Sequence, residues 1–189
     1  MIREIVTLGH PALRERAREL SAAELATDPV QALIDDLVET KRAAHGAGLA
    51  ANQVGEALRV AVVEVEPGNP RYPYKPPVPL TILVNPVIAY GKGVEMINEG
   101  CLSVPGTRAE VPRAMNVTVS YLDRDGAKRT TTARGLTAGT FQHEVDHLDG
   151  TLIVDRAEPS TVTSWEDYER GRRADFEHRA AAIVARYGS

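Results

Sequence analysis

The sequence predicts one α+β domain in which short, mainly antiparallel sheets surround a central helix. Three observations support this fold class. A chain of 189 residues has the length of a single domain. Its Val-rich runs are short and do not alternate regularly with helices, and two or three separate stretches show helical spacing of apolar residues. We therefore expect residues 1–189 to form one domain, with residues 159–189 as a C-terminal helical extension.

The first half of the chain predicts a helix followed by two strands. Residues 28–44 place apolar side chains at three- and four-residue steps, which is typical of a helix with one buried face. Residues 58–65 and 80–90 are rich in Val and Ile and predict strands, the second interrupted at Asn85-Pro86. Residues 66–79 contain many prolines, and we expect them to form a surface connector.

The second half predicts a hairpin and two helices. Residues 115–123 alternate between apolar and polar side chains, and residues 128–133 return as their partner after an Asp-Gly turn. A helix is expected to begin near Thr137 and to continue through His147. Residues 164–187 predict a last amphipathic helix, in which basic and acidic side chains balance.

Composition and charge limit the class of function. The net charge of −4 argues against a protein that acts through phosphate contacts, so we expect no DNA partner. Cys101 is the single cysteine, which excludes an intrachain disulfide and fits a reducing compartment. The first residues lack the apolar stretch of a signal peptide, and no segment has the length of a membrane span. The sequence therefore predicts a cytoplasmic protein without a membrane partner.

The segment from Gln142 to His147 has the spacing of a metal site. On a helix, His143 and His147 project from the same face, which suits two nitrogen ligands of one tetrahedral ion. Glu144 follows His143 directly in the chain, so its side chain lies beside the helix face that carries the two histidines. A general base that takes a proton from water is expected at that position.

Three arrangements could supply the third ligand. Gly150 fits a metzincin pattern, but the position of its third histidine is occupied by Ile153, which cannot bind a metal. Glu166 in the last predicted helix is the candidate in a thermolysin-like arrangement, although its neighbours are typical of a solvated helix. Cys101 is the remaining candidate, because a thiolate binds zinc or ferrous iron well.

Three short motifs, in this order, resemble those of the peptide deformylase family. They are Gly46-Ala47-Gly48-Leu49-Ala50-Ala51-Asn52-Gln53, Glu99-Gly100-Cys101-Leu102-Ser103 and Gln142-His143-Glu144-Val145-Asp146-His147. The opening segment from Gly9 to Arg14 is also similar, so the resemblance spans roughly residues 1–155. Joint occurrence of several motifs is far more specific than any one of them.

The resemblance implies a role for each matching residue. Cys101, His143 and His147 would bind one divalent ion, with Fe²⁺ the expected native metal and Zn²⁺, Ni²⁺ or Co²⁺ as alternatives. Glu144 would act as the general acid and base. The side-chain amide of Gln53 and the backbone N–H of Leu102 would donate hydrogen bonds to the formyl oxygen. The implied reaction removes the formyl group from the N-terminal methionine of nascent proteins and releases formate.

Substrate contacts follow from the same resemblance. Ala47, Gly48 and Gly100 would line the path of the peptide backbone, which would lie beside them like a strand. Leu136 and Thr140 would line the pocket for the methionine side chain. Because the family more often has bulkier apolar residues at Gly139 and Thr140, we expect a wider pocket here.

Two other functions remain open on the residues alone. One is a zinc metallopeptidase that uses His143, His147 and Glu166. The other is a non-catalytic metal or thiol module in which Cys101 is structural or redox-active. In some deformylases a basic C-terminal helix contacts the ribosome. The balanced charge of residues 164–187 makes a transient contact of that kind a hypothesis for this chain.

Overall fold

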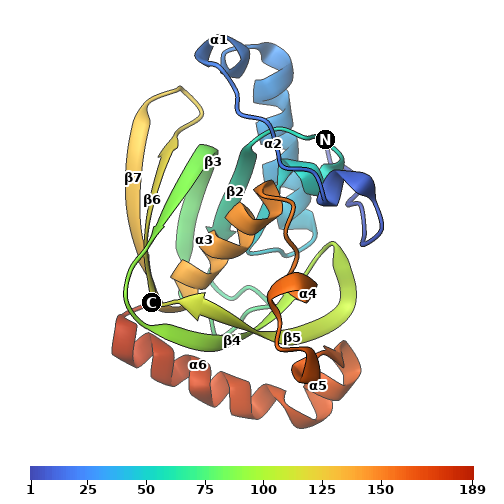
Figure 1. Ribbon diagram of the computed structural model, residues 1–189, viewed down its shortest axis with the longest axis vertical. Coiled ribbons are helices and arrows are strands. Elements are labelled where there is room, and N and C mark those ends of the chain that lie inside the picture. The colour runs from blue at the N-terminus through green and yellow to red at the C-terminus, as the bar shows by residue number, and fades with distance from the viewer.

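The computed structural model describes residues 1–189 and places two antiparallel sheets around one buried helix (Figure 1). Helix α3, Gly135–Leu148, is the central helix and carries both histidines of the predicted metal motif. The first sheet has five strands in the order β1-β2-β3-β6-β7, and the second has three in the order β4-β5-β8. The predicted α+β class and its single compact domain are confirmed.

The first sheet contains all the strands that the sequence predicted. Its strands are β1 (Gly48–Ala50), β2 (Val60–Val65), β3 (Val78–Tyr90), β6 (Asn116–Leu122) and β7 (Lys128–Arg134). Every neighbouring pair is antiparallel, and β1 pairs only with β2, so one edge of β1 has no strand partner. The interruption expected at Asn85-Pro86 is a bulge within β3. Asn85 has a φ of 49°, and the register shifts between Val84 and Val87.

The second sheet is mostly a long hairpin that the sequence did not predict. Its strands are β4 (Val94–Cys101), β5 (Val104–Ala114) and the short β8 (Thr163–Ser164). Prolines at 105 and 112 and buried arginines at 108 and 113 interrupt the period-two pattern of β5. A strand with these residues does not show the alternation on which sequence-based prediction depends.

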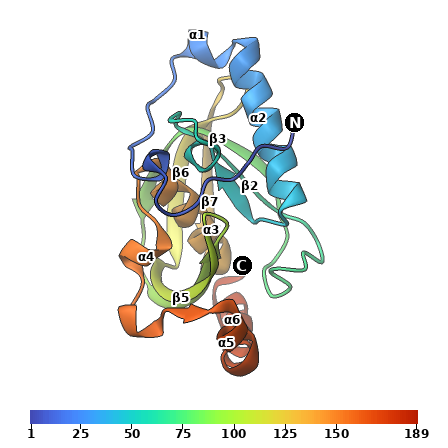
Figure 2. The same cartoon turned by 90° about the vertical axis from the view of Figure 1, so that its right-hand side faces the viewer.

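Helices cover the sheets on several sides. They are η1 (Pro11–Leu13), α1 (Ala22–Leu25), α2 (Asp28–Ala43), η2 (Ala51–Val54), α4 (Ile153–Arg156), η3 (Pro159–Thr161), α5 (Trp165–Gly171) and α6 (Arg173–Tyr187). Helix α2 lies against the face of the first sheet that is turned away from α3, as Figure 2 shows from the side. None of the helices combines the length and the apolar character that crossing a bilayer requires.

Strand β2 joins the two halves of the core because all six of its residues are buried. Val60 and Val62 pack in the cluster under α2. Ala61 and Val63 point the other way and pack in the cluster that contains Phe141 of α3. Because successive side chains of a strand point to opposite faces, β2 packs against α3 on one face of the sheet and against α2 on the other.

The C-terminal segment forms two helices rather than the single predicted one, since α5 and α6 meet at Arg172. The predicted apolar stripe is present: Phe176, Ala180 and Ile183 are buried against Leu136 at the start of α3. This packing closes the side of the domain on which the β4–β5 hairpin meets α3 (Figure 1).

Candidate metal centre and active site

Cys101, His143 and His147 converge although they come from two separate elements. Cys101 is the last residue of β4, and the histidines are one turn apart on α3. The sulfur of Cys101 lies 3.2 Å from Nε2 of His147, which lies 3.2 Å from Nε2 of His143. All three ligand atoms lie within 4.8 Å of one another.

This arrangement fits a single tetrahedral ion. Ligand atoms that are about 2.0–2.3 Å from one metal lie roughly 3.3–3.8 Å from each other, close to the separations found here. Burial lowers the pKa of His147 well below its ordinary value, which keeps this imidazole neutral and able to bind a metal. A thiol and two imidazoles are a donor set that divalent zinc or iron accepts.

Glu166, the rival third ligand, lies outside this cluster. It is an exposed residue of α5, whereas the group of side chains that could hold an ion consists of Cys101, His143 and His147. The prediction of a metallopeptidase that uses Glu166 is therefore wrong. The charged, mixed character of its helix had indicated a solvated side chain.

A chain of buried ion pairs supports His143 from behind. Oε2 of Glu99 lies 2.9 Å from Nδ1 of His143, and both carboxylate oxygens of Glu99 accept from Arg113 at 2.7 and 2.9 Å. Arg113 also donates to Asp146 at 2.5 Å. Burial alone would raise the pKa of Glu99, but Arg113 and His143 hold it below its ordinary value. A carboxylate on the far nitrogen fixes the tautomer and orientation of a histidine whose other nitrogen faces a metal.

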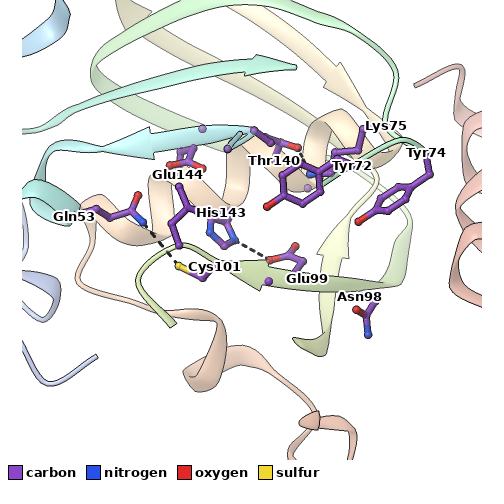
Figure 3. A pocket seen from close by; sticks show the side chains of 16 residues that line it. Gln53, Tyr72, Tyr74, Lys75, Asn98, Glu99, Cys101, Thr140, His143 and Glu144 are labelled. Atoms are coloured by element: carbon purple, nitrogen blue, oxygen red, sulfur yellow. Dashed lines mark hydrogen bonds and ion pairs between the residues drawn. The ribbon is translucent and has the colours of Figure 1, made fainter. Parts of the chain in front are cut away.

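Glu144 points into the same space beside the ligands (Figure 3). Its Oε2 is buried and has no hydrogen-bond partner in the protein, and burial raises the pKa of the carboxyl to about 7. A Cβ at Gly48 would collide with the Glu144 carboxylate, so the glycine leaves the room that this side chain occupies. The geometry places a carboxylate, free of partners, next to the candidate ligands.

The Gln53 amide is oriented by its neighbours. Its Oε1 accepts from the backbone N–H of Ala50 at 2.9 Å, which leaves Nε2 to face the site. Nε2 donates to Ser103 at 3.1 Å and lies 3.8 Å from the sulfur of Cys101. The backbone N–H of Leu102, in the turn that follows Cys101, donates to no other backbone group. One N–H donor, from Gln53, therefore lies beside the sulfur, and a second, from Leu102, follows Cys101 in the chain without a backbone partner.

A cavity opens in front of these groups. Four segments line it, namely 46–48, 72–75, 98–102 and 139–144, together with Gln53. Four of the predicted substrate contacts, Ala47, Gly48, Gly100 and Thr140, belong to this lining. Leu136 does not, because it is 1% exposed and packs against α6. The predicted contact of Leu136 with substrate is therefore absent from this cavity.

The wider pocket stays a prediction, and the structure adds to the cavity residues that sequence reasoning missed. A Cβ at Gly139 would meet Cδ1 of Ile97 at 2.7 Å, so a neighbour already fills the space beside the glycine. Segment 66–79, expected to be only a connector, brings Tyr72, Tyr74 and Lys75 into the lining (Figure 3). The aromatic residues among its prolines could have indicated this role, because a surface loop without such a role usually contains few aromatic residues.

Comparison with known proteins assigns the chain to a family. The family model for polypeptide deformylase matches residues 2–162. Peptide deformylase 2 of Nostoc sp. is 43% identical over 86% of this chain and 90% of its own length. A Met-Ala-Ser-bound class I type b peptide deformylase from Acinetobacter baumannii has a TM-score of 0.79 at 38% identity, covering 82% of this chain and 98% of that one. An actinonin complex of a peptide deformylase from Synechococcus elongatus has a TM-score of 0.73 at 32% identity and covers 98% of this chain and 86% of that one.

Proposed function

The chain belongs to the peptide deformylase family, and from that premise we propose how its own residues remove a formyl group. It is a metal-dependent hydrolase that acts on the formylated N-terminal methionine of nascent chains. The observation that carries the residue assignment is the convergence of Cys101, His143 and His147 beside a buried, unpartnered Glu144. We assign the enzyme to the cytoplasm, because nascent chains are its substrates.

Cys101, His143 and His147 are proposed to hold one divalent ion. When bound, the ion supplies Lewis-acid activation of water and of the formyl carbonyl. Fe²⁺ is our choice for the native metal, supported by the thiolate and imidazole donors and by the family, while Zn²⁺, Ni²⁺ and Co²⁺ suit the same donors. Through its hydrogen bond to Nδ1, Glu99 would hold the ring of His143 so that Nε2 stays free to bind the ion.

Glu144 is proposed to carry the proton that the reaction must move. Its free Oε2 takes a proton from water as the water oxygen adds to the formyl carbon. The same carboxyl then gives the proton to the amine nitrogen as the carbon–nitrogen bond breaks. Formate and a free N-terminal amine are the products, and Glu144 returns to its starting form.

Gln53 and Leu102 are proposed to stabilise the negative charge that develops on the formyl oxygen. Nε2 of Gln53 is held toward the site by the bond between its Oε1 and the Ala50 N–H, so little reorganisation is needed. The N–H of Leu102 adds a second donor. Loss of one such donor typically costs about 3–4 kcal/mol of transition-state stabilisation.

The substrate backbone is proposed to lie along the free edge of β1. Gly48 is the first residue of β1, and Ala47, Gly100 and Thr140 line the cavity beside it. The related Acinetobacter enzyme with Met-Ala-Ser bound supports a peptide in this cleft. An extended peptide gains main-chain hydrogen bonds when it adds to an exposed strand.

Ribosome contact through α6 receives little support from its charges. Arg173 is paired with Glu169 and Glu177 within the helices, and Arg179 is paired with Glu110 of β5. Basic side chains that are already paired contribute little to binding of phosphates. We therefore propose α6 as a structural element of this domain, with its docking role left to a ribosome-binding measurement.

Formate release from formyl-Met-Ala-Ser tests the proposal. Glu144→Ala should lower kcat by roughly 10²–10⁴ while metal content is retained, and Cys101→Ala should lose the metal. Glu166→Ala, on the exposed side of α5, serves as the matched control and should leave both properties unchanged. Full activity of Glu144→Ala would contradict the proposed proton transfer.

A further inference from the structure

One end of the active-site cavity holds a lysine. Nζ of Lys75 donates to Oγ1 of Thr140 at 2.8 Å, and it lies 4.9 Å from the centre of the Tyr72 ring. Thr140 in turn donates to the carbonyl of Leu136 at 3.2 Å, so its hydroxyl accepts from the ammonium. Figure 3 shows Lys75, Tyr72 and Tyr74 together at the end of the cavity opposite Gln53 and Cys101.

The segment that carries Lys75 is anchored, so the lysine is held at this position. The hydroxyl of Tyr74 accepts from Nη2 of Arg108 at 3.2 Å, and its ring packs edge-on against Phe176 of α6 at 5.0 Å. The backbone N–H of Lys75 donates to the carbonyl of Tyr72 at 3.0 Å. The contacts reach Arg108 of β5 and Phe176 of α6, and both of these side chains are buried.

The ammonium keeps hydrogen-bonding capacity for a ligand. A lysine has three N–H donors, and the hydrogen bond to Thr140 uses one of them. Glu99 and Glu144 attract the Lys75 ammonium only through space, and neither carboxylate accepts a hydrogen bond from it. An apolar side chain that enters the cavity would leave the remaining donors without partners, whereas an acceptor oxygen would satisfy one of them.

From this arrangement, and resting on the proposed deformylase function, we propose that Lys75 lets the side-chain pocket accept, besides methionine, a first residue that ends in a hydrogen-bond acceptor. The formylated N-terminus of a nascent chain carries methionine, and oxidation adds an oxygen to the sulfur of that side chain. The enzyme therefore accepts formyl-methionine sulfoxide chains as well as formyl-methionine chains. The hydrolysis is the same for both, and the sulfoxide itself is not altered.

The test compares three peptides with the metal-loaded enzyme: formyl-Met-Ala-Ser, its methionine sulfoxide form and its norleucine form. Norleucine has the length of methionine and no acceptor atom, so the ratio of kcat/KM for sulfoxide to norleucine reports the polar contact. In the wild-type enzyme we expect this ratio to be one or more. In Lys75→Met it should fall by roughly 10- to 100-fold, the usual effect of a hydrogen bond to a charged donor.

Two further variants distinguish the contact in the pocket from a general effect of removing a positive charge. Lys92→Met removes the same charge from an exposed turn and should leave the ratio unchanged. Thr140→Val removes the hydroxyl that holds Nζ and should lower the ratio in the same direction as Lys75→Met. If Lys75→Met does not fold, Thr140→Val and the wild-type series still decide the question.

A wild-type ratio below one, or the same ratio in wild type and Lys75→Met, would overturn the inference. Either result can occur while formyl-Met-Ala-Ser is hydrolysed normally, which leaves the deformylase function intact. Failure of the wild-type holoenzyme to release formate from formyl-Met-Ala-Ser would instead reject the proposed function itself.

Discussion

Two buried charge clusters in this molecule have similar chemistry and different positions. In the first, Glu64 of β2 accepts from Lys41 at 2.7 Å and from Arg42 at 2.7 and 2.9 Å, both on α2. In the second, Glu99 and Asp146 accept from Arg113. Both clusters neutralise charge inside the protein, but only the second touches a candidate metal ligand, His143.

The difference shows that burial of an ion pair does not by itself indicate a functional site. Removing water from two charges costs as much free energy as their attraction returns, or more, so such pairs are weak evidence for added stability. The Glu64 cluster joins α2 to β2, and the next charged group beside it is Glu66, 3.9 Å from Nζ of Lys41. The Glu99 cluster ends at a histidine nitrogen, where small errors of orientation would change metal binding.

Arg113→Met should have the largest effect of the substitutions that test this difference between the two clusters. It leaves Glu99 and Asp146 buried without their shared partner, which typically costs about 3–5 kcal/mol of unfolding free energy. It also releases Glu99, so metal affinity should fall. Urea unfolding and metal content per chain measure the two losses. Unchanged metal content in the folded variant would show that this cluster does not position His143.

A matched pair of substitutions, one in each cluster, tests the same difference and should have smaller effects. Glu99→Gln and Glu64→Gln each remove one buried negative charge with little change of shape. We expect Glu99→Gln to weaken metal affinity by about 10- to 100-fold, because its link to His143 loses the carboxylate. Glu64→Gln should lower unfolding free energy and leave metal affinity unchanged. Competition with a metal-binding dye measures affinity, and equal weakening in both variants would contradict the distinction.

The pH dependence of Glu64 tests the cluster that has no contact with a candidate metal ligand. Its hydrogen bonds with Arg42, followed by those with Lys41, lower the pKa of Glu64 from 4.5 to about 2, against the effect of burial. A carboxyl with a lowered pKa adds stability above pH 4.5, and that contribution disappears as the pH falls toward 2. At about 1.4 kcal/mol per pKa unit, the contribution is at most about 3.5 kcal/mol.

Urea unfolding of the wild type and of Glu64→Gln at several pH values measures this contribution. The difference between the two proteins should be constant above pH 5 and should shrink below pH 4.5. A difference that does not change with pH would mean that the charge of Glu64 contributes nothing.

The sequence predicted the parts of the site that lie close together in the chain. His143, Glu144 and His147 occupy one helix, where their spacing alone places them on or beside one face, and family resemblance added Cys101 to the candidate ligands. Helix α2 and four strands were also predicted, since their apolar residues recur regularly.

What the sequence did not predict depends on long-range packing. The β4–β5 hairpin has prolines and buried arginines that hide its alternation. Lys75 reaches Thr140 and Arg113 reaches Asp146 across the fold. No local pattern indicates such contacts, because they exist only after the sheets and α3 have assembled.

The short length of β1 has a consequence for self-association. Its free edge offers backbone groups that another chain could pair with, as any unprotected strand edge does. The strand has only three residues, Gly48–Ala50, so a second folded copy would find few hydrogen bonds there. We infer that this short edge offers too few hydrogen bonds to act as a template on which copies of the chain would aggregate.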